Sequence, residues 1–181
     1  IPMFIFMGTM LEKSGVAKDL LYALQILLRR VPGGLALSVT IMGTIMAATT
    51  GIIGASVVMM TLLALPVMLE RNYDKSLSTG TIAASGTLGI LIPPSIMLVI
   101  MADLLAISVG TLFVASVFPG LLLAVLYFIY LLLRTRLNPK LAPPLPENTG
   151  PDNAREKIKL IFKSFLPPIF LIFLVLGSIF A

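Results

Sequence analysis

The sequence predicts an all-α polytopic membrane protein with a re-entrant helical hairpin and a discontinuous transmembrane helix. Three observations lead to this fold class. The composition is 58% hydrophobic and 12% charged, with a mean hydropathy of +1.06, which excludes an ordinary soluble domain. An uncharged run, Leu35–Leu69, is interrupted at its middle by glycines, threonines and a serine. A second uncharged run contains a proline pair.

We expect six consecutive segments in a fragment of a longer, multi-pass protein. The chain begins at Ile1 without a methionine and stops at Ala181 inside an apolar run. The expected segments are 1–34, the end of one membrane helix plus an interfacial amphipathic helix; 35–75, the hairpin with its closing turn; 76–102, the discontinuous helix; 103–133, a loop and a plain transmembrane helix; 134–163, a proline-rich cytoplasmic linker; and 164–181, the start of another transmembrane helix.

The first segment contains a helical pattern from Val16 to Arg30, in which leucines at helical spacing are mixed with charged residues. This pattern is typical of an amphipathic helix that lies in the membrane interface. The extended end of a spanning helix is the alternative interpretation. Pro32, Gly33 and Gly34 end the helix in either case.

The hairpin is predicted from the length of Leu35–Leu69. A spanning helix needs about 20 apolar residues, so this run is too long for one crossing. Each half, about 14 residues or about 20 Å of helix, is too short to cross alone. A hairpin that enters and leaves on one side resolves this conflict. Its tip, Thr49–Ser56, is expected near mid-membrane, where irregular backbone persists only if protein buries it or it lines a cavity.

The discontinuous helix is predicted from Pro93 and Pro94, which follow the small-residue stretch Ser85–Gly89 and precede Ser95. A proline pair removes two backbone donors and forces the preceding residue out of the helical region. We therefore expect two half-helices with an unwound middle.

The hydrophilic linker 134–163 carries five prolines, a composition that favours an extended, polyproline-like strap. Ala154–Lys163 is expected to be a basic interfacial helix. Pro167 and Pro168 would lie in the first turn of the last spanning helix.

The lysines and arginines set the expected topology. All thirteen fall on one side of the membrane if 35–69 is a hairpin and 76–102 and 111–133 each cross once. An ordinary crossing at 35–69 would put basic residues on both faces. Because positive residues concentrate in cytoplasmic loops, the distribution favours the hairpin and places its open ends in the cytoplasm. The topology accounts for the net charge of +5, so no nucleic-acid partner is needed.

The residue inventory excludes most catalytic chemistry. The chain has no His and no Cys, and none of its uncharged segments contains Asp or Glu. Membrane enzymes need intramembrane acids, a histidine cluster or a serine with a base, so we expect a protein that is not an enzyme and has no cofactor. Proton-coupled carriers also use intramembrane acids or histidines. A coupling cation held by neutral oxygens, such as sodium, is therefore favoured.

Two clusters could provide oxygens and half-helix ends for a sodium ion and an anionic substrate. The cluster at the hairpin tip comprises Thr49, Thr50, Gly51, Gly54, Ala55 and Ser56. The cluster in the discontinuous helix comprises Ser85, Gly86, Thr87, Gly89, Pro93, Pro94 and Ser95. Gly51 and Gly54 are expected to adopt positive φ and to approach the discontinuous helix closely. Thr87 and Ser95 would complete an oxygen cage facing the tip. Close helix packing is the alternative role for each small residue taken singly.

Several stretches together resemble a known family, the large membrane (M) subunit of tripartite ATP-independent periplasmic (TRAP) transporters, which is called DctM-like. These stretches are FMGTMLEKSGVAKDLL, VPGGLALSV, AATTGIIGASVVMM, RNYDKSLSTGTIAASGTLGILIPPSI, ISVGTLFVASVFPGLLLAVLY and LPPIFLIFLVLGSI. The pairing of a TGIxGAS-like tip with GTLGxxIPPSI about 35 residues later is specific. The resemblance covers almost the whole chain.

The resemblance implies an elevator-type secondary transporter, driven by sodium, that imports organic acids such as C4-dicarboxylates across the inner membrane of a bacterium or archaeon. Its partners would be a small membrane (Q) subunit and a periplasmic substrate-binding protein, besides the lipid bilayer. Residues 35–69 would be the inward-opening hairpin of the transport domain, and residues 1–34 would include the end of a scaffold helix. The second inverted repeat of the family is missing, so the chain holds about half of the binding machinery and should not transport alone.

Two other functions remain open. A sodium/dicarboxylate symporter would use no binding protein, and a non-transporting membrane assembly subunit would keep the fold without the site. Ion-dependent uptake separates a carrier from an assembly subunit, and a requirement for a binding protein separates the two kinds of carrier.

Overall fold

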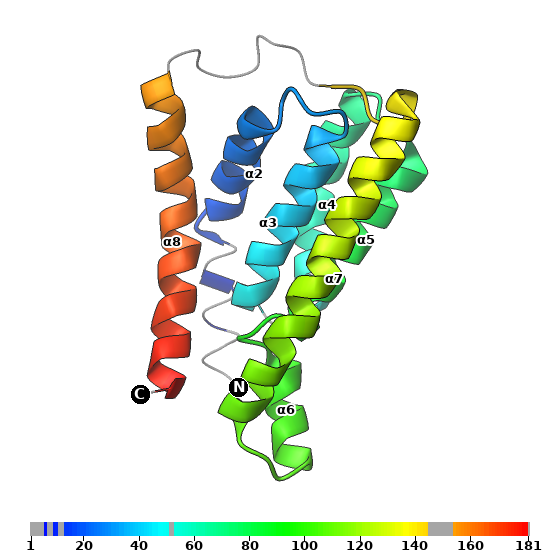
Figure 1. Cartoon of the computed structure of the whole chain (residues 1–181). Coiled ribbons are helices and arrows are strands. Elements are labelled where there is room, and N and C mark those ends of the chain that lie inside the picture. The colour runs from blue at the N-terminus through cyan, green and yellow to red at the C-terminus, as the bar shows by residue number, and fades with distance from the viewer. Residues whose placement is uncertain (1–5, 7–8, 11–12, 51–52, 145–153, 181) are drawn as a thin grey trace.

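The computed structural model describes residues 6, 9–10, 13–50, 53–144 and 154–180, and within these ranges the regular structure is helical. The elements are α2 (Val16–Leu27), α3 (Gly34–Thr50), α4 (Ile53–Glu70), α5 (Lys75–Leu91), α6 (Ile96–Leu104), α7 (Val109–Leu137), the 3-10 helix η1 (Pro139–Leu141) and α8 (Ala154–Phe180). Figure 1 shows the long helices roughly aligned in a bundle. The predicted all-helical class is confirmed, whereas the helix end predicted at 1–9 lies almost entirely outside the described residues.

α3 and α4 form an antiparallel pair, and Figure 1 shows α4 returning beside α3. Their outer ends meet, because the backbone N–H of Leu35 donates to the hydroxyl of Tyr73, just beyond α4, at 3.3 Å. The two helices contain 17 and 18 residues, about 25–27 Å each, and are longer than the predicted halves. The pair therefore has the shape of a helical hairpin.

Hydroxyl side chains of the hairpin pair with carbonyls of their own helix. Ser38, Thr40 and Thr44 donate to the carbonyl four residues earlier at 2.7, 3.1 and 2.8 Å, and Thr61 does so at 2.7 Å. Because these hydroxyls find partners without water, a helix rich in Ser and Thr remains compatible with an apolar environment.

α5 and α6 make up the broken helix. Asp74 caps the start of α5, its carboxylate accepting a hydrogen bond from the N–H of Leu77 at 2.9 Å. Pro93 and Pro94 prevent α5 from continuing, and α6 departs at an angle of 43°. Together the two helices are long and apolar enough for one bent membrane crossing, as the proline pair predicts.

Among the described residues, α7 is the single unbroken helix long and apolar enough to cross a membrane by itself. Only 17% of its most apolar stretch is buried by the rest of the fold. The exposed side chains are nevertheless apolar, among them Phe118, Leu121 and Val125. Such a surface suits contact with lipid or with another membrane-embedded protein.

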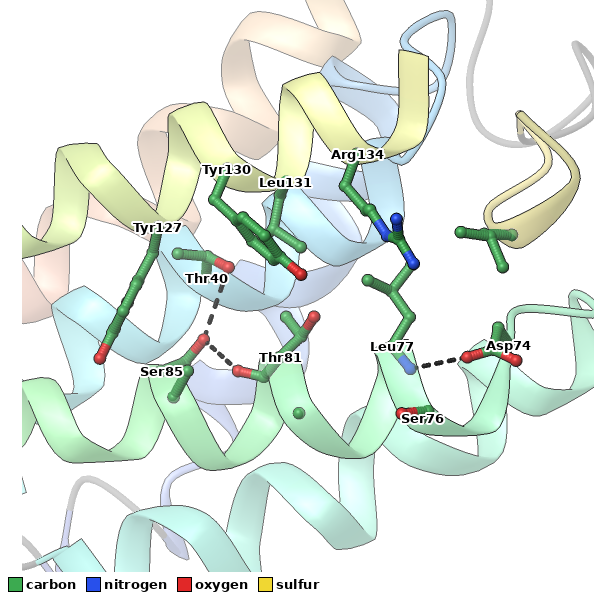
Figure 2. Close-up of a pocket in the computed structure, with 13 residues that line it drawn as sticks. Thr40, Asp74, Ser76, Leu77, Thr81, Ser85, Tyr127, Tyr130, Leu131 and Arg134 are labelled. Carbon is green, nitrogen blue, oxygen red and sulfur yellow. Dashed lines mark hydrogen bonds between the residues drawn. The ribbon is translucent and has the colours of Figure 1, made fainter. Parts of the chain in front are cut away.

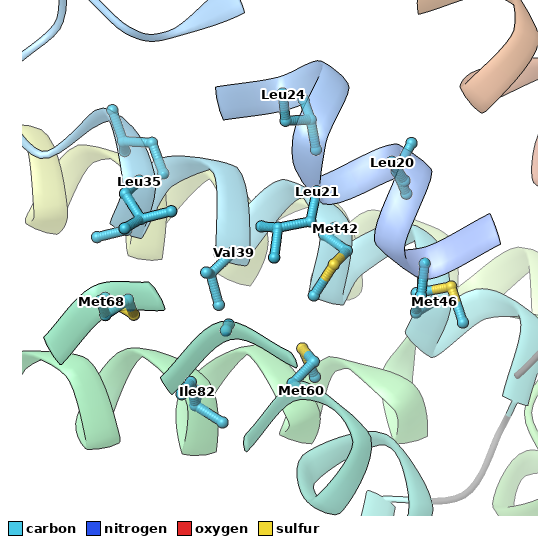
Figure 3. Close-up of a cluster of buried hydrophobic side chains, with 14 of the residues drawn as sticks. Leu20, Leu21, Leu24, Leu35, Val39, Met42, Met46, Met60, Met68 and Ile82 are labelled. Carbon is cyan, nitrogen blue, oxygen red and sulfur yellow. The ribbon is translucent and has the colours of Figure 1, made fainter. Parts of the chain in front are cut away.

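The hydrophobic core lies between α2, α3, α4 and α5 (Figure 3). α3 is the central helix and contacts α2, α4, α5, α7 and α8. Methionines contribute much of the core, since their flexible thioethers fill irregular gaps between helices. The nearly inaccessible side chains of this core include Leu20, Leu24, Leu35, Leu37, Val39, Met42, Met46, Met60 and Met68.

α2 is a packed member of the bundle. It buries a face that includes Leu20, Leu21 and Leu24 and contacts both α3 and α8. Figure 1 shows it inclined along α3. The interfacial position of this helix stays a prediction.

The chain after α7 folds back onto the outer end of the hairpin. The N–H of Gly33 donates to the carbonyl of Ala142 at 3.2 Å, and the N–H of Asp74 donates to the carbonyl of Leu141 at 2.9 Å. The Thr135 hydroxyl donates to the carbonyl of Pro32 at 3.1 Å. This part of the predicted extended strap is therefore a docked 3-10 turn, because the backbone ends of α3 and α5 give it hydrogen-bond partners. The prolines at 146 and 151 lie outside the described residues.

α8 is one continuous helix, where the sequence suggests an interfacial helix followed by a separate spanning helix. Pro167 and Pro168 lie inside it. Helices in apolar surroundings tolerate internal prolines when neighbouring groups satisfy the freed carbonyls, and α8 contacts α2 and α3.

Candidate functional site

The break between α5 and α6 is buried and holds a hydroxyl without a partner. Ser95 occupies the N-cap position of α6 in an extended conformation, and its side chain is 0% exposed. Its Oγ makes no hydrogen bond with any described residue. An unpaired buried hydroxyl costs roughly 1–3 kcal/mol, so this position favours a ligand that supplies the missing interaction. Pro93 and Pro94 beside it are also buried.

The stretch Ser85–Gly89, which belongs to the predicted cluster of the discontinuous helix, is itself helical. α5 runs without interruption to Leu91, and the irregular backbone is confined to residues 92–95. Ser85 is buried, and its Oγ donates to the carbonyl of Thr81, one turn earlier, at 2.6 Å. Each glycine weakens a helix by about 1 kcal/mol, but packing against α3 and α4 holds this segment helical.

The predicted cluster in the discontinuous helix makes close contacts with α3 and α4. A Cβ added at Gly86 would collide with Cγ2 of Val57 in α4. A Cβ added at Gly43 of α3 would lie 2.6 Å from Cβ of Ser85. The helical turn that contains Ser85 and Gly86 therefore lies between α3 and the first turns of α4. It contacts Val57, the residue that follows Ser56.

The hairpin tip is described in part. Thr49 and Thr50 end α3, residues 51–52 lie outside the described ranges, and Gly54, Ala55 and Ser56 belong to the first turns of α4. Ser56 is buried, with 1% of its surface exposed. Gly51, for which positive φ is predicted, is one of the residues that the structure does not describe.

Gly54 does not behave as predicted. It is exposed and helical, it is not among the glycines with positive φ, and an added Cβ would meet nothing within 4 Å. The predicted close approach at this position is wrong. Gly86 makes that approach from the other helix, because α4 presents Val57, not Gly54, to α5.

Thr87 faces away from the hairpin. It is exposed, its Oγ1 donates to the carbonyl of Ala84 at 2.7 Å, and it lies 3.5 Å from the hydroxyl of Tyr127 in α7. The predicted oxygen cage of Thr87 and Ser95 facing the tip is therefore wrong, since helical geometry turns Thr87 toward α7. Gly89, by contrast, is buried.

Three further hydroxyl residues, Thr40, Ser78 and Thr81, are absent from the clusters predicted from the sequence. Ser78 and Thr81 lie on the face of α5 that carries Ser85, and Thr40 lies opposite that face. Thr40 of α3 places its Oγ1 3.5 Å from Oγ of Ser85. Thr81 is buried, and its Oγ1 has no partner among the described residues. Ser78, Thr81 and Ser85 are spaced by three and four residues, which puts them on one helix face. That spacing could have identified Ser78 and Thr81, whereas Thr40 lies on α3 and has no such signal.

The arrangement offers neutral oxygens and a helix N-terminus. The described residues contain no group of three or more His, Cys, Asp or Glu side chains that could hold a metal ion. Hydroxyl and carbonyl oxygens suit an alkali cation, while the N–H groups at the start of α6 suit an anion. These groups could therefore bind a cation or an anion.

Known proteins are similar to this chain in sequence. The chain matches the family described as "Tripartite ATP-independent periplasmic transporter, DctM component" over residues 1–181. It is 34% identical over 146 residues to the C4-dicarboxylate TRAP transporter large permease protein DctM of Pseudomonas aeruginosa, covering 81% of this chain and 34% of that protein. It is 38% identical over 124 residues to the isethionate TRAP transporter permease protein DctMQ of Oleidesulfovibrio alaskensis, covering 67% and 19%.

A third relative is the ectoine TRAP transporter large permease protein TeaC of Halomonas elongata, 33% identical over 130 residues, covering 72% of this chain and 30% of that protein. The chain thus spans about a third or less of each of these relatives. The family match nevertheless includes the hairpin, the broken helix and every other segment. The chain therefore belongs to the DctM family of TRAP transporter large permease components.

Proposed function

We propose that the chain is part of the permease subunit of a sodium-coupled, binding-protein-dependent secondary transporter that imports an organic acid. The observation that carries this proposal is Ser95, a fully buried hydroxyl that has no partner among the described residues and lies at the break of an apolar crossing. A polar group in such a place is costly unless it serves a ligand. In a carrier that binds and releases small solutes, such a hydroxyl could bind the solute or the coupling ion.

The choice of sodium rests on the side chains around the broken helix. Residues 76–102 contain no ionisable side chain, and the acidic residues of the hairpin and its closing turn are Glu70 and Asp74, at the outer end. Oxygens available within the bundle come from hydroxyls and from backbone carbonyls. These ligands suit sodium, whereas proton coupling would need a titratable group inside the bundle.

The moving part is proposed to be the unit of α3, α4 and α5. The close contacts of Gly43 with Ser85 and of Gly86 with Val57 favour movement of these helices together. The unit would carry the site as a rigid body, in an elevator-type movement. The hairpin would enter the inner membrane from the cytoplasm and return to the same side.

The proposed partners are a small membrane (Q) subunit, a periplasmic substrate-binding protein and the organic acid itself. One relative is named as a DctMQ permease, and the relatives are named for C4-dicarboxylate, isethionate and ectoine. Because these compounds differ in chemistry, the hydroxyls of Ser95 and its neighbours do not select among them. Other groups would determine which organic acid is transported.

The test is uptake by the full-length protein with its Q subunit and binding protein in proteoliposomes. Uptake of a C4-dicarboxylate or another organic acid delivered by the binding protein is expected to need an inward sodium gradient and to change little when an uncoupler collapses only the proton gradient. Equal uptake with choline in place of sodium would reject sodium coupling.

The same assay separates the two alternatives. Full uptake without the binding protein would favour a sodium/dicarboxylate symporter of the kind that works alone. A folded complex that shows no uptake with any organic acid under either gradient would favour a non-transporting assembly subunit.

A further inference from the structure

A cavity of about 170 Å³ lies between α5 and α7, apart from the break that holds Ser95. Figure 2 shows its walls, with α7 on one side and α5 on the other. Thr40 of α3 and Leu141 of η1 also contribute to the lining. The space would hold several water molecules or one small charged group.

One buried hydroxyl of this cavity has no partner. Thr81 is 5% exposed, and its Oγ1 makes no hydrogen bond with any residue that the structure describes. Figure 2 shows this hydroxyl turned toward α7, where the hydroxyl of Tyr130 points back toward α5. The backbone of Thr81 is already used, since its carbonyl accepts from Ser85 at 2.6 Å. The side chain is therefore free to pair with a molecule in the cavity.

The cationic side chain that lines the cavity, Arg134, also has no partner among the described residues. The guanidinium of Arg134 extends from α7 on the side that faces α5 (Figure 2) and forms neither an ion pair nor a hydrogen bond with the described part of the chain. Asp74, the acid at the rim, already accepts a hydrogen bond from the N–H of Leu77 at 2.9 Å as the cap of α5. The group without a partner is thus the hydroxyl of Thr81, beside a guanidinium with five N–H donors, and together these suit an oxyanion bound away from the Asp74 carboxylate at the rim.

The rest of the lining is apolar. Leu77, Ala84 and Leu131 form part of the wall, and the aromatic rings of Tyr127 and Tyr130 complete it. A free inorganic anion would leave these surfaces without a partner, whereas a molecule with an alkyl body would cover them.

We propose that this cavity binds the oxyanion end of an amphiphile, with a phosphate or carboxylate held by Arg134 and Thr81 and an alkyl body against Leu77 and Leu131. Two sources share this chemistry, a phospholipid headgroup and a soluble alkyl carboxylate. The ligand would bridge α5 and α7 and so hold the proposed mobile unit against the exposed span. Binding can be measured without transport, so this inference is tested separately from the proposed function.

The test uses the full-length protein purified in dodecyl maltoside and isothermal titration calorimetry. The probes are dioctanoyl-phosphatidylglycerol, sodium octanoate, inorganic phosphate, and dioctanoylglycerol as the control that lacks an oxyanion. The variants are Arg134→Gln, which removes the charge, and Thr81→Val, which removes the hydroxyl at nearly constant volume. Arg136→Gln is the matched control, because Arg136 lies in the same last turn of α7 but not in the cavity lining.

The expected result is binding of at least one amphiphilic anion, weakened about tenfold or more by Arg134→Gln and several-fold by Thr81→Val, and changed less than about twofold by Arg136→Gln. Thr81→Val should fold normally, because it removes an unpaired group. Binding of the phosphatidylglycerol alone identifies a lipid site, and binding of octanoate identifies a soluble carboxylate. The inference is overturned if no amphiphilic anion binds, if dioctanoylglycerol binds equally well, or if Arg134→Gln and Arg136→Gln have the same effect.

Discussion

At the scale of single residues, Ser95 differs from the buried serines Ser38, Ser78 and Ser85 in the use of its hydroxyl. Ser38, Ser78 and Ser85 each donate to a carbonyl four residues earlier. Ser95 stands at the start of α6, after two prolines and outside both helices. Irregular backbone at residues 92–95 separates it from the carbonyls of α5, and its hydroxyl makes no hydrogen bond with the described residues.

Replacing Ser95 with alanine tests whether that partner is the coupling ion. We expect Ser95→Ala to raise the sodium concentration for half-maximal uptake about 5- to 150-fold, because one neutral ligand is worth roughly 1–3 kcal/mol. Thermal stability without sodium should not fall, since the variant deletes an unpaired group. The measurement is sodium-dependent uptake in proteoliposomes together with a melting temperature in detergent.

Ser78→Ala is the matched control. The carbonyl of Asp74 that accepts from the Ser78 hydroxyl at 2.8 Å also accepts from the Ser78 N–H, so that carbonyl stays paired in the variant. Its sodium dependence should be that of the natural protein. A lower melting temperature with unchanged sodium dependence for Ser95→Ala would instead assign Ser95 to packing.

Tyr73 joins the two ends of the hairpin. Burial raises the pKa of Tyr73 from 10.0 to about 12, partly offset by the hydrogen bond from the N–H of Leu35. Because the folded state disfavours the phenolate, this contribution to stability is complete below about pH 10 and is lost as the pH rises through about 12. The hairpin ends should therefore loosen in strong alkali.

Tyr73→Phe keeps the ring but removes both the acceptor and the titrating group. At pH 8 the variant should be less stable by about 0.5–1.5 kcal/mol, the typical net value of one hydrogen bond. Between pH 10 and 12 its melting temperature should fall less steeply than that of the natural protein. Parallel pH profiles would show that Tyr73 does not titrate as proposed.

At the scale of elements, packing between helices depends on two glycines that are fully inside helices. Gly43 and Gly86 let α3 and α4 approach α5 more closely than any Cβ allows. Gly120 of α7 has a related position, since an added Cβ would lie 3.1 Å from the carbonyl oxygen of Leu91, next to the break. Small residues thus bring the hairpin, the broken helix and the exposed span together.

Gly86→Ala should destabilise the protein by about 1–3 kcal/mol, since the new methyl group would collide with Val57. Adding Val57→Ala should recover part of that loss, because the collision disappears. Gly54→Ala should be tolerated, because the structure shows open space there and no positive φ. Melting temperatures of the three variants in detergent provide the measurement, and a Gly54→Ala effect as large as that of Gly86→Ala would contradict this account.

At the scale of the whole molecule, the outer ends of the hairpin, of α5 and of α7 are joined at one end of the bundle. Hydrogen bonds connect Leu35 with Tyr73, Gly33 with Ala142, and Asp74 with Leu141. Seven of the thirteen basic residues lie within a few positions of these joints, at 29, 30, 71, 75, 134, 136 and 140. Figure 1 shows the turn between α6 and α7 at the opposite end.

Single cysteines test this topology, and the absence of native cysteines from the chain simplifies the experiment. In a cysteine-free full-length background, cysteines at Arg30, Lys75 and Arg136 should react with an impermeant maleimide from the cytoplasm, and one at Ala106 from the periplasm. Labelling of positions 30 and 75 from opposite sides would abolish the re-entrant hairpin.

The sequence by itself determined which segments are apolar, where the chain must break and which family it belongs to. Length and the absence of charge in 35–69 predict the hairpin shape, and Pro93–Pro94 predict the bend, because backbone chemistry acts locally. The directions of side chains, by contrast, are not set by the local sequence. Whether Thr87 turns to α7, whether Gly54 or Gly86 makes the close contact, and whether Ser85 is unwound depend on which helix packs opposite. Only the tertiary structure decided these points, since small residues have weak local preferences and take their conformation from their neighbours.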